Sequence, residues 1–209
     1  MNGRIRGAGH AIADFTVKCV CARCNGGWMS AIENEAAPFL EPMIRGNPVV
    51  LGAEAQRAIA SWLALKAIVY RYTQSPLRPV SADTLRYFHR HHLPPQDWYI
   101  LIMKYIGESP ARMSLHTWDV MRTTGQTLRF SVRRYRMLML IAMGYFAGEL
   151  VAFEKPMKAI RVRREGWGLQ LWPPTAPGDE RRIHWPPPKM VGDGHLEHLS
   201  QLRSDGMPR

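Results

Sequence analysis

Apolar residues recur at helical spacing in the first part of the chain and predict three helices. The first is expected to begin at Ser30, because the sequence S-A-I-E from Ser30 to Glu33 has the pattern of a capping box. In that motif the serine and glutamate side chains each satisfy a free backbone N–H group. Pro38 and Pro42 predict that this helix is short or kinked, since proline lacks the backbone N–H. Two further helices are expected over 53–73 and from Ser81, a favoured N-cap residue.

After residue 96 the pattern changes to short runs of β-branched and aromatic residues separated by glycines, which predict strands. The expected strands cover 97–105, 111–120, 127–132, 135–143 and 150–153, with two more within 159–172. The run Met137–Phe146 is also compatible with a buried helix, because a short apolar run does not define a period. Helices followed by strands predict an α+β fold with an antiparallel sheet.

Changes in composition along the 209 residues predict one domain with small appendages, in three segments. Residues 1–45 hold a cysteine cluster and the first helix, residues 46–172 the other helices and the sheet, and residues 173–209 a tail rich in proline and tryptophan. The sequences W-P-P from Trp172 and W-P-P-P from Trp185 predict extended, polyproline-like stretches. We expect these tryptophans to pack as covers on the sheet.

The chain carries 28 Lys and Arg against 17 Asp and Glu, a formal net charge of +11. Most of this excess lies in residues 111–172, with 11 basic and 4 acidic side chains. Such a field attracts polyanions, of which nucleic acid is the most common. No apolar run approaches the roughly 18 residues of a membrane-spanning helix, and the N-terminus lacks the apolar block of a secretory signal. We therefore expect a cytoplasmic protein with nucleic acid, and no membrane, as its partner.

Seven arginines are the candidate nucleic-acid contacts: Arg129, Arg133, Arg134, Arg136, Arg161, Arg163 and Arg164. A guanidinium group binds phosphate through paired hydrogen bonds and stacks on bases. In a strand, Arg134 and Arg136 share one face. The alternative is a solvated sheet face on which these arginines pair with nearby glutamates.

Three cysteines, Cys19, Cys21 and Cys24, lie within six residues. A C-x-x-C pair can give two thiolates to Zn²⁺ where the turn is tight, and the glycines that follow add backbone freedom. A closed structural site needs four ligands, so Cys21 and Cys24 supply half of one and Cys19 is a candidate third. In a protein of the cytoplasm such a cluster indicates metal binding before redox chemistry. The alternative is reduced thiols without a metal.

A second cluster of metal-ligating side chains, His89, His91 and His92, lies near the expected end of the third helix. His89 and His92 share a helix face, so a metal ion could bridge them. The alternative is a polar helix end, where cationic side chains interact favourably with the helix C-terminus.

The cysteine segment also carries a family resemblance. The sequence C-A-R-C-N from Cys21 to Asn25, with G-W-M-S from Gly27 and I-E from Ile32, resembles the second half of the zinc knuckle of HNH (ββα-metal) endonuclease-like proteins. More narrowly, it is similar to a group of bacterial and phage proteins with the motif C-x-x-C-N-x-G-W-M-S-x-L-E. The W-P-P sequences of the tail also resemble the ending of that group. The resemblance implies nucleic-acid binding and a structural zinc held by Cys21 and Cys24.

The same resemblance implies hydrolysis of phosphodiester bonds with Mg²⁺ or Mn²⁺. Such a nuclease needs a general base to activate water and a hard cation to polarise the phosphate. The family carries a first C-x-x-C and an acidic residue followed by histidine upstream of this motif, and both are missing here. The remaining candidates are His10 as the base and Asn25 as an orienting group. The sequence therefore predicts an HNH-like endonuclease or a degenerate or N-terminally shortened relative.

Two other functions remain open at this point. One is a non-catalytic nucleic-acid-binding module that uses the arginine-rich sheet face, with DNA expected over RNA. The other is a structural or protein-interaction component of a phage or mobile element, which would show no polyanion affinity beyond that of any basic protein.

Overall fold

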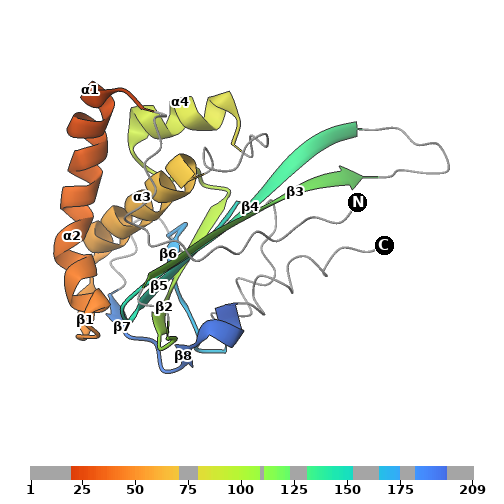
Figure 1. Cartoon of the computed structure of the whole chain (residues 1–209). Helices are drawn as coiled ribbons and strands as arrows, with labels where there is room; N and C mark the ends of the chain where they lie inside the picture. The colour runs from red at the N-terminus through yellow and green to blue at the C-terminus, as the bar shows by residue number, and fades with distance from the viewer. Residues whose placement is uncertain are drawn as a thin grey trace.

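The computed structural model describes residues 20–70, 80–108, 111–122, 131–152, 165–174 and 182–196, and gives the backbone alone for 111–122, 131–138 and 151–152. Its longer helices lie on one side of a largely antiparallel sheet and a short helical turn at 193–196 lies on the other, which confirms the predicted α+β fold (Figure 1). Among the described residues, no helix combines the length and the hydropathy that crossing a membrane requires.

The first helical region starts earlier than predicted. α1 (Ala22–Cys24), η2 (Asn25–Met29) and α2 (Ser30–Ile44) follow one another without a break. Ser30 has helical backbone angles, φ −62° and ψ −35°, and so lies inside the helical path. α2 begins at Ser30, as predicted, but Ser30 does not cap it: Met29 precedes it with helical angles and no side-chain cap, whereas Cys21 caps the separate turn α1. The path bends at Gly27, whose φ of −103° and ψ of −114° are not helical.

Of the two alternatives predicted from Pro38 and Pro42, a short helix is wrong, because α2 contains both prolines and ends at Ile44, and a kinked helix stays a prediction. The prolines remove two backbone donors, which leaves the carbonyls of Asn34 and Pro38 without their helical partners. Both of these residues are exposed, so water can hydrogen-bond to their carbonyls. The opposite side of α2 is buried along its length by Ile32, Ala36, Leu40 and Met43, and this packing holds the helix together.

The other two predicted helices are confirmed as α3 (Ala53–Tyr70) and α4 (Ala82–His91). The Ser81 Oγ accepts the backbone N–H of Thr84 at 3.1 Å, which is the predicted N-cap. α3 is buried on most sides, since it packs against α2 and also against the sheet (Figure 1). It approaches strand β5 (Phe146–Ala152) closely: a Cβ atom on Gly148 would lie 2.6 Å from the Leu63 Cδ2.

The main sheet has the strand order β3-β4-β5-β2-β6, with β8 added in parallel beside β2. Its strands besides β5 are β2 (Trp98–Tyr105), β3 (Ala111–Arg122), β4 (Ser131–Met143), β6 (Leu169–Trp172) and β8 (Met190–Val191). The alternative of a helix over 137–146 is wrong, because Met137–Met143 belongs to β4 and a turn at Gly144 leads into β5. The strands expected at 127–132 and 135–143 form one strand from Ser131, and residues 127–130 lie outside the described part.

Strand β2 is buried on both of its faces. On β2, Ile100 and Ile102 join the cluster under the helices, whereas Leu101 and Met103 join a second cluster on the opposite face. This alternation follows the two-residue period of a strand. One fully buried carboxylate, Glu149, lies on β5 between Leu101 and Leu140 of the neighbouring strands.

The tryptophans of the two W-P-P sequences are part of the core. Trp172 ends β6, and Trp185 ends β7 (Ile183–Trp185), which pairs with β1 (Val49–Leu51) in a second, two-stranded sheet. Both are almost completely buried in the cluster that α2 and α3 cover, and each precedes a cis proline. This cluster contains residues from all three predicted segments of the chain. The segment boundaries after residues 45 and 172 stay predictions.

β3 and β4 extend beyond the rest of the described sheet. The described pairing of β4 with β5 stops where Met137 faces Ala152, whereas β3 and β4 continue to pair from Trp118↔Arg136 to Arg122↔Ser131. Figure 1 shows these two strands leaving the body of the molecule on the side away from α2. We call this two-stranded part, residues 118–122 and 131–136, the arginine ribbon.

Candidate nucleic-acid interface

The arginine ribbon gathers several of the arginines that the sequence singled out. Arg133, Arg134 and Arg136 lie on its β4 strand, and Arg122 lies at the end of its β3 strand. Arg122 was missed, although it follows directly on the strand predicted over 111–120. Of the other predicted contacts, Arg129, Arg161, Arg163 and Arg164 lie outside the described residues, and their role stays a prediction.

The ribbon carries charge on both of its faces. Successive residues of a strand alternate between faces, so Arg134 and Arg136 share the face of Leu140 and Ala142, and Arg133 belongs to the other. Residues 118–136, which include the connection between the two strands, hold five arginines and one acidic residue, Asp119, for a net charge of +4. More than a third of the net charge of the chain therefore lies in this short stretch.

The cysteine segment forms a helix start. Cys21 has an extended backbone, and its Sγ accepts the backbone N–H of Cys24 at 3.4 Å. This hydrogen bond, together with others from the same turn, lowers the pKa of the Cys21 thiol, because it stabilises the thiolate. Asn25 is helical and exposed, and its backbone N–H donates to the Cys21 carbonyl at 3.0 Å. The described contact of Asn25 is thus a structural one in the first turn.

Cys21 and Cys24 are two free thiols, the first exposed and the second half-buried. Across the described part of the chain, no three His, Cys, Asp or Glu side chains come together in a way that could hold a metal ion. The predicted third ligand, Cys19, and the predicted base, His10, lie outside the described residues. The structural zinc and the catalytic Mg²⁺ or Mn²⁺ therefore stay predictions.

The histidine cluster packs against the cysteine segment through Trp28. The Trp28 ring stacks on the His92 ring, with 5.1 Å between ring centroids and 9° between ring planes. It also meets the rings of His89 and Phe88 edge-on, with centroid distances of 5.4 Å and 6.1 Å. His89 and His92 do share a face, as predicted, but that face covers an indole ring. Sequence reasoning missed this contact, because its partners are far apart in the chain.

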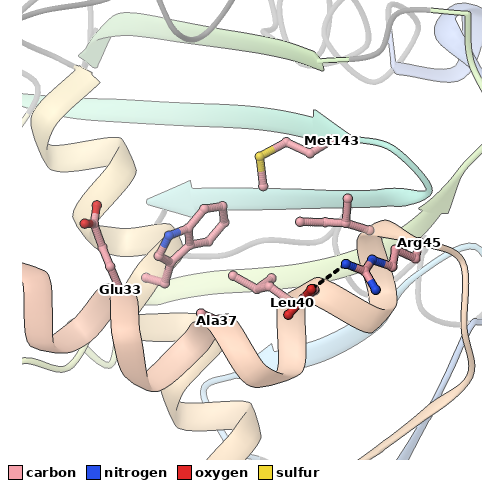
Figure 2. Close-up of a pocket in the computed structure, with 8 residues that line it drawn as sticks. Glu33, Ala37, Leu40, Arg45 and Met143 are labelled. Atoms are coloured by element: carbon pink, nitrogen blue, oxygen red, sulfur yellow. Dashed lines mark hydrogen bonds and ion pairs between the residues drawn. The ribbon is translucent and has the colours of Figure 1, made fainter.

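A shallow groove of about 370 Å³ lies between α2, α3 and the end of β4 (Figure 2). Leu40, Trp62 and Met143 make its surface apolar. At its edge, Glu41 forms an ion pair with Arg45, and Glu33 forms one with Lys66. Because each carboxylate at the edge already has a basic partner, this groove offers no excess positive charge to a phosphate.

Comparison with known proteins finds no matching family model, no similar curated protein and no similar solved structure. The HNH-like family therefore stays a prediction from the motif at Cys21, and the candidate interface rests on the ribbon itself.

Proposed function

We propose that this protein binds nucleic acid through the arginine ribbon and that binding needs no catalytic centre. The observation that supports this most directly is the pairing of β3 with β4 past the last described pair of β4 with β5, which gathers Arg122, Arg133, Arg134 and Arg136 on one two-stranded element. Guanidinium groups suit phosphate oxygens, since their planar fork of N–H donors makes paired hydrogen bonds.

The position of the ribbon supports the same function. A group of like charges on a projecting element repels itself, and a polyanion that neutralises several of these charges removes that repulsion while releasing its own counterions. The ordinary alternative, pairing with acidic residues, has little support within the ribbon, since Asp119 is its one acidic residue. Binding to nucleic acid also agrees with the expected cytoplasmic location.

The proposal predicts that affinity for nucleic acid depends more on the ribbon arginines than on other exposed arginines. In the variant Arg133→Gln/Arg134→Gln/Arg136→Gln, affinity for a labelled nucleic acid should fall at least tenfold, because three phosphate contacts are lost. The matched control is Arg57→Gln/Arg86→Gln/Arg90→Gln, which removes the same charge from exposed positions on α3 and α4. Fluorescence anisotropy at one fixed salt concentration measures both.

The control should lose no more than about threefold, since it changes only the general field of the molecule. Equal losses in the two variants would mean that the net charge of +11, rather than the ribbon, attracts nucleic acid. Wild-type binding no stronger than that of an unrelated protein of equal charge would refute the proposed function.

Hydrolysis is a separate prediction that comes from the motif resemblance. Its test is incubation of plasmid with the purified protein and Mg²⁺, Mn²⁺ or Zn²⁺, with His10→Ala as the comparison. Cleavage that disappears in the variant would support a nuclease, whereas uncut plasmid with both proteins would leave binding as the activity of the chain.

A further inference from the structure

The backbone around Cys21 and Cys24 suits a disulfide bond between them. The backbone N–H of Asn25 donates to the Cys21 carbonyl at 3.0 Å, which closes one helical turn over residues 21–25. Residues three apart in such a turn have Cα atoms about 5 Å apart, because a helix rises about 1.5 Å per residue at a radius of about 2.3 Å. A disulfide spans about 4.4–6.8 Å between Cα atoms, so this turn already has the required spacing.

The Cys21 side chain lies over Cys24. Cys21 has an extended backbone, with φ −75° and ψ 156°, which turns its side chain back over the first helical turn. Its Sγ is 3.4 Å from the backbone nitrogen of Cys24. A bond between the two sulfur atoms therefore requires rotation of side chains and no movement of the helix.

The two thiols differ in their exposure to solvent. Cys21 is exposed, whereas Cys24 is half-buried and packs against the cluster under the helices. A disulfide in solution therefore reaches the Cys21 sulfur first, and the Cys24 sulfur is left to close the bond within the protein. Arg23, between the two cysteines, is exposed and basic, which favours the approach of an anionic disulfide such as oxidised glutathione.

We propose that Cys21 and Cys24 are a redox-active dithiol that reduces low-molecular-weight disulfides. The Cys21 sulfur attacks R–S–S–R, forms a mixed disulfide and releases one R–S group, and the Cys24 sulfur then attacks the Cys21 sulfur and releases the second. The two thiol protons pass to the released groups, so two protein thiols and one small disulfide become one protein disulfide and two small thiols. The protein loses two electrons and the small disulfide gains them. This activity goes beyond nucleic-acid binding and does not depend on it.

The test equilibrates the full-length protein with a fixed ratio of reduced to oxidised glutathione under argon, stops the exchange with acid and alkylates the free thiols. Trypsin cuts after Arg23, so a bond between Cys21 and Cys24 links peptide 19–23 to peptide 24–45. Mass spectrometry measures the fraction of linked peptide. We expect the link to form in the wild type and to disappear after addition of excess dithiothreitol.

The matched control moves one thiol along the same helix. Cys19→Ser leaves Cys21 as the partner of Cys24 in the link, and we expect this variant to form the link as fully as the wild type. The control Cys19→Ser/Cys24→Ala/Gly26→Cys keeps one thiol in each peptide, but Cα atoms five residues apart in a helix are separated by about 8–9 Å, beyond the reach of a disulfide. A Cβ atom on Gly26 meets open space, so the control should fold. Its link should be at least about tenfold less abundant at the same glutathione ratio.

Single variants test the order of the two attacks. Cys24→Ser should accumulate a mixed disulfide of glutathione with Cys21, because the second attack is missing. Cys21→Ser should form a mixed disulfide at Cys24 at least about tenfold more slowly, because that sulfur is half-buried. Equal rates in the two variants would contradict Cys21 as the attacking sulfur.

Three results would overturn the redox proposal. The first is a link no more abundant in Cys19→Ser than in the control. The second is a link in the wild type that Cys19→Ser abolishes, which would make Cys19 the partner of Cys24. The third is wild-type protein that holds zinc by elemental analysis and forms no link, which would assign both sulfur atoms to the predicted zinc site, since a zinc-bound sulfur is not free to attack a disulfide. Nucleic-acid affinity is measured separately, and none of these results changes it.

Discussion

At the scale of single residues, the helix start at Cys21 makes one thiol more reactive than its neighbour. The Cys24 backbone N–H donates to the Cys21 Sγ, and this bond holds the pKa of the Cys21 thiol below its ordinary value. The thiolate is therefore present at lower pH than in an ordinary cysteine, whose pKa is about 8.5, and it is lost as pH falls through the lowered pKa.

The lowered pKa of Cys21 predicts the order in which the thiols of metal-free protein are alkylated. With iodoacetamide, we expect Cys21 to react before the half-buried Cys24, and its rate to reach half of its maximum below about pH 8.5. Peptide mass spectrometry across a pH series measures both. A Cys21 rate that rises only at the pH of a free cysteine peptide would show that the helix-start hydrogen bonds are absent.

Trp28 is the residue that joins the cysteine segment to α4. We expect Trp28→Ala to lower the free energy of unfolding by about 2–3 kcal/mol, somewhat less than for a fully buried tryptophan, because the ring stacks on His92 but is only half-buried. Trp28→Phe should cost about 1 kcal/mol, since it keeps a ring, and the indole N–H has no hydrogen-bond partner among the described residues. Urea denaturation gives both values, and equal costs would contradict this packing.

At the scale of elements, the approach of α3 to β5 is a close contact that depends on Gly148. We expect Gly148→Ala to destabilise the protein by about 1–3 kcal/mol, because the new Cβ would lie 2.6 Å from the Leu63 Cδ2. Gly26→Ala is the matched control: its Cβ would meet open space, and alanine favours a helix over glycine by about 1 kcal/mol. Thermal unfolding of the two variants should therefore shift in opposite directions. A Gly148→Ala protein as stable as the wild type would contradict the close packing of α3 on β5.

Elements with a strong local signal were predictable, and those decided by distant contacts were not. Ser81 marks the start of α4 in both the sequence and the structure, because an N-cap acts on the three residues after it. The capping-box pattern at Ser30 is equally local and marks the start of α2, but the residue before Ser30 is already helical, so Ser30 does not cap the helix. Pro38 and Pro42 remain inside α2 because burial of one helix face outweighs two lost backbone hydrogen bonds.

The candidate interface was predictable only where it depends on local sequence. The arginines at 133, 134 and 136 and their strand context follow from the sequence, and so does the shared face of Arg134 and Arg136. That they lie beside Arg122 depends on the register of β3 with β4. This is a non-local property, since a strand's partner is set by residues far along the chain.

At the scale of the whole molecule, β4 connects the core to the proposed interface. From Met137 to Met143 it lies between β3 and β5 and contributes buried residues such as Met139 and Ile141. From Ser131 to Arg136 the same strand forms one side of the arginine ribbon. The ribbon is therefore the direct continuation of a buried strand, which fixes its direction relative to the body.

The salt dependence of DNA binding tests the central claim most directly. If the four ribbon arginines contact phosphates, the logarithm of the association constant should fall with the logarithm of salt concentration with a slope of about −4. We expect Arg133→Gln/Arg134→Gln/Arg136→Gln to make this slope shallower by about 3, while Arg57→Gln/Arg86→Gln/Arg90→Gln leaves it within about 1 of the wild type. The same slope for wild type and ribbon variant, or an equal change in both variants, would contradict binding through the arginine ribbon.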